Sequence, residues 1–233
     1  MTLVEAVVRA GPLPGAEASQ AEKKRYSEVL SSHLAQEVAQ GLRRVSFKNV
    51  KPPRGGPGER AFQGGLGPKK VDVSSADEQH GLLLAVSVKT ITAAPFGKNL
   101  RNRFADLCTE AITLHMRFPY GVVCALFAFP AAADADVTKG RKTSTFRRAM
   151  KLMAAVGGRE EYTGPGEKFE NVTMMLFQPA GEKRSKPWVR LFNANGEAQI
   201  SESDYFTLLR DVYNRRNPNA PIGEPEEGLG EQA

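Results

Sequence analysis

The clearest hydrophobic pattern lies near the N-terminus and predicts one long amphipathic helix. Apolar side chains recur at every fourth position, a spacing that gathers them on one face of a helix; they are Tyr26, Leu30, Leu34, Val38 and Leu42. Ser19 and Glu22 precede most of this stripe and are spaced as in a capping box, where each side chain accepts a hydrogen bond from the other residue's backbone. We therefore expect a helix that begins after Ser19 and ends near Arg44.

The centre of the chain alternates between extended and helical patterns. Aliphatic and β-branched residues fill Leu82–Ile91, and a near-continuous apolar run covers Tyr120–Pro130, as in a strand covered on both faces. Between them, apolar positions three and four apart predict a helix over Lys98–Arg117. Before these elements we expect a short strand at Lys70–Val73 and a polar turn over residues 74–81.

The C-terminal part continues this mixture. We expect a helix over Thr143–Val156, strands at Val172–Gln178 and Trp188–Phe192, and a last helix that Ser201 caps and that ends near Arg216. This order of elements predicts an α/β fold, a sandwich with a central mixed sheet flanked by helices.

The remaining segments show no hydrophobic period. Met1–Ala18 contains Gly, Pro and Ala without a repeat, and Lys51–Lys70 is rich in Gly and Pro, so we expect a loose N-terminus and an irregular loop. The predicted organisation is a flexible N-terminus at residues 1–18, a single domain over 19–216 and a flexible acidic tail over 217–233.

Charge adds a hint about partners. The chain has 32 Lys and Arg against 26 Asp and Glu, a formal net charge of +6. The four glutamates of residues 217–233 have no basic neighbour in that segment, so the rest of the chain is more basic still. A basic body suits a polyanionic partner such as nucleic acid, although charge alone fits a merely soluble basic protein equally well.

Several classes of protein are excluded. No apolar run reaches the ~18–20 residues of a membrane-spanning helix, and Glu5 and Arg9 interrupt the N-terminal segment, which does not resemble a secretory signal. Cys108 and Cys124 both lie in apolar patterns and are expected to be buried thiols. We therefore expect a cytoplasmic protein with no membrane segment.

Side chains able to carry chemistry converge on the centre. Asp72 lies in the short predicted strand, and Ser87 and Lys89 project from one face of the next strand because they are two residues apart. The rise per residue of strand and helix places Asp106 about level with Lys89 and Glu110 about level with Ser87. We expect one or both of these helix carboxylates beside Ser87, and the spacing does not decide between them.

This set of groups suits phosphodiester hydrolysis. Two carboxylates can hold Mg²⁺ through hard oxygen ligands while the ion keeps several waters. The bound ion activates a water and neutralises charge on the phosphate, and a nearby lysine orients that water or stabilises the developing charge. Asp72, Lys89 and a helix carboxylate would supply these parts.

The segment GPKKVDV, the turn, LLLAVSVK and the following helix resemble the PD-(D/E)XK nuclease superfamily of restriction-endonuclease-like proteins. The resemblance covers roughly residues 19–130 and implies a restriction-endonuclease-like fold. It implies that Asp72 is the motif Asp and Lys89 the motif Lys. Ser87 departs from the family, which usually has an acid there; some restriction enzymes are similar in having Ser-X-Lys and take the missing carboxylate from the next helix.

The resemblance also implies the remaining parts of the site. Asp106 or Glu110 would complete the metal site with Asp72, and the first helix would add a glutamate, for which Glu28 and Glu37 are the candidates.

Basic residues around these elements are expected to contact the phosphate backbone. They are Lys69, Lys70, Arg103, Arg141, Lys142 and Arg147.

The sequence thus predicts a Mg²⁺-dependent endonuclease acting on double-stranded DNA, with a restriction or phage-defence function implied by the resemblance. Cleavage of both strands favours a homodimer, since one site faces one strand, and a larger defence complex stays open. The alternative is a catalytically inactive module of the same fold that binds nucleic acid or a partner protein, an idea motivated by Ser87. A third interpretation is an enzyme acting on RNA or branched DNA.

Overall fold

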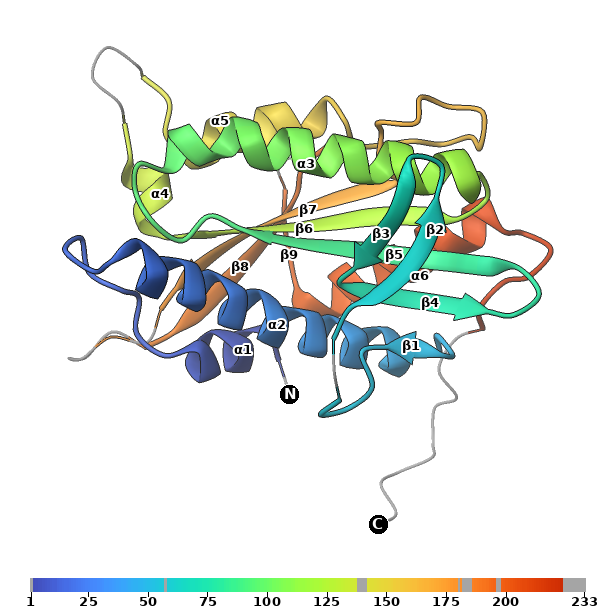
Figure 1. Ribbon diagram of the computed structural model, residues 1–233, viewed down its shortest axis with the longest axis horizontal. Coiled ribbons are helices and arrows are strands. Elements are labelled where there is room, and N and C mark those ends of the chain that lie inside the picture. The colour runs from blue at the N-terminus through green and yellow to red at the C-terminus, as the bar shows by residue number, and fades with distance from the viewer. Residues whose placement is uncertain are drawn as a thin grey trace.

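The fold is built on a seven-stranded mixed sheet with the order β1-β4-β5-β6-β7-β8-β9 (Figure 1). The computed structural model describes residues 2–56, 58–137, 142–179, 181, 186–195 and 198–223. The strands of this sheet are β1 (Val50–Lys51), β4 (Val73–Asp77), β5 (Gly81–Thr90), β6 (Val122–Pro130), β7 (Asn171–Gln178), β8 (Trp188–Asn193) and β9 (Gln199–Ile200). Strands β5, β6 and β7 are parallel, and the other neighbours are antiparallel. The expected α/β class with a mixed central sheet is confirmed.

Helices cover both faces of this sheet. The helices are α1 (Leu3–Ala10), α2 (Gln20–Arg44), α3 (Phe96–Arg117), α4 (Ala132–Ala135), α5 (Thr145–Ala154) and α6 (Glu202–Arg216). Helices α1, α2 and α6 pack on one face, and α3 and α5 pack on the other (Figure 1). None of the helices within the described ranges combines the length and the apolar character needed to cross a membrane.

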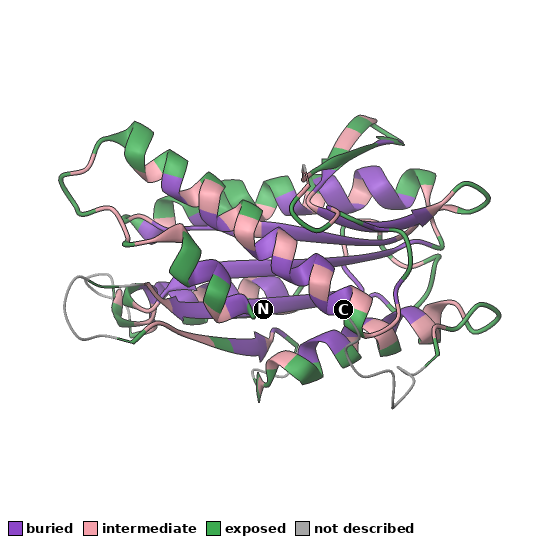
Figure 2. Cartoon of the chain, turned by 90° about the horizontal axis from the view of Figure 1, so that it is seen from below, coloured by how far each residue is buried: buried purple, intermediate pink, exposed green. Residues whose placement is uncertain are grey.

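The alternation of side chains along the strands builds two cores. In β6, Cys124 and Leu126 face the α2 side, whereas Ala125 and Phe127 face the α3 side, as the two-residue period of a strand requires. Every residue of β6 is buried, and the sheet lies as a purple layer between half-exposed helices in Figure 2. The same period in β5 sends Val86 and Val88 toward α2, so Ser87 and Lys89 point toward α3.

The predicted long helix is confirmed as α2. The Ser19 hydroxyl accepts a hydrogen bond from the Glu22 backbone N–H, and the Glu22 carboxylate accepts one from the Ser19 N–H. The expectation that residues 1–18 are loose is wrong for α1. A second capping box, between Thr2 and Glu5, starts this helix, which buries a short apolar face in the core.

The expectation of an irregular loop over residues 51–70 holds for residues 52–56 and 58–59 but is wrong for residues 60–70. Strands β2 (Arg60–Gly64) and β3 (Gly67–Val71) pair as an antiparallel hairpin that packs on α3 (Figure 1). Gly64 allows this contact, because a Cβ there would lie 2.4 Å from the Thr113 side chain. The neighbouring Gly65 N–H donates to the Thr113 carbonyl at 2.8 Å.

Two boundaries near Asp72 differ from the prediction. Asp72 does not lie inside a strand but joins β3 to β4, the point where the chain passes from the hairpin to the main sheet. Residues 74–77 belong to β4 rather than to a polar turn, because Ser74 and Ser75 are buried by pairing on both sides. The Ser75 hydroxyl finds a partner in the Lys48 carbonyl at 2.7 Å.

Candidate active site

The candidate site lies where the hairpin, β5 and α3 meet. Asp72 stands at the junction of β3 and β4, and its Oδ2 accepts a hydrogen bond from the Val88 N–H of β5 at 2.8 Å. This bond holds the carboxylate against the strand that carries Ser87 and Lys89. The structure therefore brings Asp72 beside the Ser-X-Lys pair, at the end of β5 that leads into α3.

Lys89 lies between two carboxylates. Its Nζ is 3.6 Å from Asp72 Oδ2 and 3.2 Å from Glu110 Oε2. The Ser87 hydroxyl donates to Glu110 Oε1. Lys69 of the hairpin approaches from the other side, with its Nζ 3.1 Å from Glu110 Oε2. Strand, helix and hairpin thus each contribute charged groups to one small cluster.

Glu110, not Asp106, is the helix carboxylate in this cluster. The Glu110 side chain is 1% exposed and contacts Ser87, Lys69 and Lys89. The Asp106 side chain is 52% exposed, and its Oδ2 lies 3.2 Å from Arg103 Nη1 on the same helix. Asp106 and Glu110 are four positions apart on α3, slightly more than one helical turn. This separation is enough to place Glu110 in the cluster and Asp106 at the surface.

Burial shapes the ionisation of Asp72 and Lys89. Burial raises the pKa of Asp72, an effect that the charge of Lys89 and the Val88 N–H only partly offset. Burial alone would lower the pKa of Lys89, but the charges of Glu110 and Asp72 outweigh it and raise that pKa above its usual value. Lys89 is therefore held as an ammonium ion at neutral pH.

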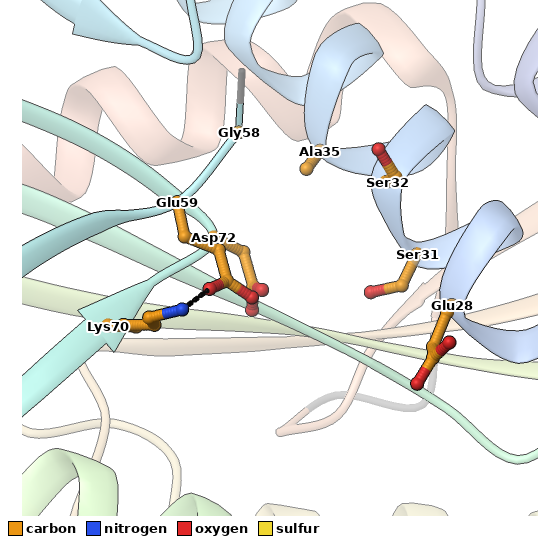
Figure 3. Close-up of a pocket in the computed structure, with 8 residues that line it drawn as sticks. All are labelled: Glu28, Ser31, Ser32, Ala35, Gly58, Glu59, Lys70 and Asp72. Atoms are coloured by element: carbon orange, nitrogen blue, oxygen red, sulfur yellow. Dashed lines mark ion pairs between the residues drawn. The ribbon is translucent and has the colours of Figure 1, made fainter.

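A pocket of about 460 Å³ opens in front of Asp72. Figure 3 shows Asp72, Glu59 and Lys70 on one wall and Glu28, Ser31 and Ser32 of α2 on the other. Lys70 Nζ lies 3.1 Å from Glu59 Oε2. Of the cluster of Asp72, Lys89 and Glu110, Asp72 is the member that lines this pocket on the side of α2.

The two glutamates expected from the first helix are separated. Glu28 lines the pocket in front of Asp72, with its side chain pointing toward the cavity (Figure 3). Glu37 does not line it; this carboxylate is buried beside Arg9 of α1 and lines a different cavity. Only Glu28 shares the pocket with Asp72.

The basic residues expected at a phosphate backbone also divide into groups. Lys69 and Lys70 of β3 contact the site through Glu110 and Glu59. Arg103 lies about two helical turns from Glu110 on α3. Lys142 precedes α5 and Arg147 lies on it, and neither residue lines the pocket in front of Asp72. Arg147 Nε is 3.6 Å from Asp134 Oδ1. Arg141 lies outside the described residues.

The sequence pattern did not single out Glu59, Ser31 or Ser32 as parts of the site. Ser31 and Ser32 occupy the polar side of a predicted amphipathic helix, where polar residues are the rule. Glu59 precedes the sequence RAFQGGLGPKKV, whose two extended runs around a Gly-Gly pair are the signal of the hairpin.

The cluster fits a hydrated Mg²⁺ ion. Magnesium takes one or two carboxylates and keeps several waters, and Asp72 and Glu110 flank the same ammonium group at 3.6 and 3.2 Å. Glu110 Oε2 lies 3.1 Å from Lys69 Nζ and 3.2 Å from Lys89 Nζ, so an ion bound there would share this oxygen with the two ammonium groups or displace them. No group of three or more His, Cys, Asp or Glu side chains with metal-binding geometry occurs among the residues described, so the fit rests on two carboxylates and water.

Comparison of the chain with protein-family models, with curated proteins and with solved structures found no match in any of the three. The function is therefore inferred from the chemistry of the chain's own side chains.

Proposed function

We propose that this protein is a Mg²⁺-dependent endonuclease that hydrolyses phosphodiester bonds in DNA. The observation that carries the proposal is the position of Lys89 between Asp72 and Glu110, beside an open pocket. A buried ammonium group flanked by two hard-oxygen ligands supplies both the ion site and the positive charge that phosphoryl chemistry needs.

Each side chain then has a distinct task. Asp72 and Glu110 would hold the ion, which when bound activates a water and neutralises charge on the scissile phosphate. Lys89, whose ammonium group lies between these two carboxylates, would stabilise negative charge that develops on the phosphate oxygens. Ser87 orients Glu110 through its hydroxyl, and the Val88 N–H orients Asp72.

The order of elements supports the resemblance to PD-(D/E)XK nucleases. Helix α2 precedes the antiparallel strands β4 and β5, and the crossover helix α3 then leads to the parallel strand β6. Asp72 comes directly before β4, and Lys89 lies on β5. Ser87 stands where that family usually has an acid, and Glu110 brings a carboxylate to the Ser87 side chain from α3. By this resemblance we propose a restriction or phage-defence function in the cytoplasm, with a homodimer cutting two strands and a larger defence complex as a further possibility.

One observation favours a different function. Lys69 and Lys89 both lie within ion-pair distance of Glu110 Oε2, so in this arrangement the carboxylate is fully balanced by charge without an ion. A nuclease-fold module that has lost its metal would keep such a balance and bind nucleic acid or a partner protein without cutting. Magnesium binding separates the two functions.

The test combines metal binding with cleavage. Purified protein is titrated with MgCl₂ by calorimetry and incubated with duplex DNA, branched DNA, single-stranded DNA and RNA, with Mg²⁺ or with chelator. We expect saturable Mg²⁺ binding and metal-dependent cuts in duplex DNA that the Lys89→Ala variant does not make. Absence of both binding and cleavage would favour the inactive module, and cleavage confined to RNA or to branched DNA would change the substrate.

A matched variant guards against a contaminating nuclease. Lys48 is an exposed lysine at the β1 edge of the sheet and does not line the pocket in front of Asp72. Lys48→Gln, purified in parallel, should cut like the wild type. Cleavage that persists in Lys89→Ala at the wild-type rate would refute the assignment of the site.

A further inference from the structure

We infer that the nucleic acid strand on one side of the cut lies along α2, in a groove that leads from Asp72 to Lys24 and Arg103. The inference rests on the proposed nuclease function and adds the path of the substrate. It assigns phosphate-binding functions to residues of α2 and to the start of α3, which lie away from the metal-binding carboxylates.

Two adjoining cavities form this groove. The pocket in front of Asp72 and a second cavity of about 250 Å³ share Glu28 as a lining residue. Along α2 the second cavity continues through Ser27, Lys24 and Lys23. Its opposite wall is the segment after β5 and the first turns of α3, and includes Asn99 and Arg103. The wall along α2 is therefore continuous from Ser32 to Gln20.

The floor of the groove is fixed in place by α2 and β5. Ser27 Oγ lies 2.5 Å from Thr90 Oγ1, and the Ser31 hydroxyl donates to the Val88 carbonyl at 3.3 Å. These bonds anchor the helix to the strand that carries Lys89. Short serine side chains also leave room for a sugar-phosphate backbone to approach the helix, whereas long side chains would fill the groove.

The sign of the charge changes along the groove. The pocket in front of Asp72 is lined by the carboxylates of Asp72, Glu59 and Glu28 and by one cation, Lys70, which pairs with Glu59. The far end carries the cations Lys23, Lys24 and Arg103, which suit phosphates.

The cations at the far end remain available to a ligand. Lys24 Nζ is 3.7 Å from Glu28 Oε1, and Arg103 Nη1 is 3.2 Å from Asp106 Oδ2. Both pairs are largely exposed, and such pairs contribute little because water and salt screen them. A phosphate can therefore replace the carboxylate partner at small cost.

The length of the groove sets which phosphate is contacted. Lys24 and Ser31 are seven residues apart on α2, which is about 10 Å along the helix at ~1.5 Å per residue. A strand of duplex DNA advances ~3.4 Å per nucleotide along its axis. Lys24 is therefore expected to contact a phosphate about three nucleotides from the cut.

The test measures affinity in the absence of cleavage. Binding of a fluorescent duplex to the full chain is followed by anisotropy in chelator, for the wild type and for Lys24→Gln/Arg103→Gln. We expect the double variant to bind at least tenfold more weakly, and the slope of log affinity against log salt to fall by about two. With Mg²⁺, its KM should rise while kcat stays near the wild-type value. Lys48→Gln/Arg215→Gln removes two exposed cations that line neither cavity and should bind like the wild type.

Truncated duplexes then locate the contact. Once the cut is mapped, shortening one side of it to fewer than three nucleotides should reduce wild-type affinity to that of Lys24→Gln/Arg103→Gln, with no further loss in the variant. The proposed path along α2 would be refuted if the wild type and Lys24→Gln/Arg103→Gln bound the duplex with equal affinity. It would also be refuted if Lys48→Gln/Arg215→Gln lost as much affinity as Lys24→Gln/Arg103→Gln.

The outcomes also separate this inference from the proposed function. Cleavage by the wild type together with binding that ignores Lys24 and Arg103 would keep the nuclease and refute the groove. Binding that depends on Lys24 and Arg103 without any cleavage would support the groove and refute the nuclease.

Discussion

At the scale of single residues, the central feature is Glu110, a carboxylate that helix α3 places against Ser87 of strand β5. Glu110 is buried and takes its partners from two strands: Ser87 and Lys89 on β5, and Lys69 on β3. A buried carboxylate is stable only when it is paired in this way. Its two neighbouring lysines therefore balance its charge, and Lys89 links it to Asp72.

Substitution of the two helix acids should have opposite results. Glu110→Gln keeps the shape of the side chain and removes the negative charge, so kcat for DNA cleavage should fall by on the order of a hundredfold or more. Asp106→Asn alters an exposed group and should leave kcat within about threefold of the wild type. Single-turnover rates with saturating enzyme check both values. A larger loss in Asp106→Asn than in Glu110→Gln would assign the helix carboxylate to Asp106.

The sequence predicted that Asp72, Ser87 and Lys89 lie together beside a carboxylate of the following helix, either Asp106 or Glu110, and the structure brings the first three together with Glu110. The sequence did not decide between the two acids, because four residues on a helix differ by roughly 6 Å along the axis and 40° around it. That difference depends on how α3 rolls against the sheet and the hairpin. The hairpin itself was not predicted, so the approach of Lys69 to Glu110 was not foreseen.

At the scale of elements, a second buried cluster joins the far ends of the helices to the sheet. The Glu170 carboxylate accepts from the Val123 N–H and from Arg159 Nη1, both at 2.8 Å. His115 Nε2 of α3 lies 3.2 Å from Glu170, and Arg216 Nη1 of α6 lies 3.6 Å away. One buried carboxylate thus links both helix layers to β6.

The ionisation of Glu170 should make the free energy of unfolding depend on pH in the acidic range. Burial alone would raise the pKa of Glu170, but the hydrogen bond and charge of His115, the Val123 N–H and Arg159 outweigh it and lower that pKa. Since the unfolded chain then binds the proton more tightly, the contribution of Glu170 to stability is present above its ordinary pKa of 4.5 and is lost as pH falls through the lowered value. Glu170→Gln should destabilise the protein by about 3–5 kcal/mol at pH 7, because it leaves buried cations unpaired.

Urea unfolding at pH 7 and at several values below pH 4.5 checks this prediction. The destabilisation caused by Glu170→Gln should shrink as the wild type loses stability in acid. A difference between the two proteins that stays constant down to the lowest pH would contradict the assignment.

Elements with a strong hydrophobic period were predicted well, and short ones were not. The apolar stripe of α2 predicts a helix buried on one face, and the apolar run of β6 predicts a strand buried on both faces. In each case the hydrophobic pattern alone indicates the structure. Helix α1 and the β2–β3 hairpin are stabilised by contacts with distant parts of the chain, such as the pairing of Gly65 with Thr113. The capping box of α1 and the two extended runs of the hairpin are present in the sequence, but no local pattern indicates which distant residues these elements contact.

At the scale of the whole molecule, the mixed sheet creates the site by joining a small hairpin to a large sheet. Asp72 is the residue at which the chain passes from one to the other. Helix α2 forms the opposite wall of the pocket from the other layer (Figure 3). The alternation of the strands predicted which side chains of β5 share a face, whereas the folding of the hairpin over α3 required the three-dimensional structure.

The most direct measurement is the rate of Mg²⁺-dependent cleavage of duplex DNA by the wild type and by Asp72→Asn under single-turnover conditions. Far-ultraviolet circular dichroism and the melting temperature of both proteins show whether the fold is kept. We expect the wild type to cut the duplex and Asp72→Asn to cut it on the order of 10²–10³ times more slowly with its fold intact. Equal rates for the two folded proteins, or no cleavage by the wild type at any Mg²⁺ concentration, would contradict the account.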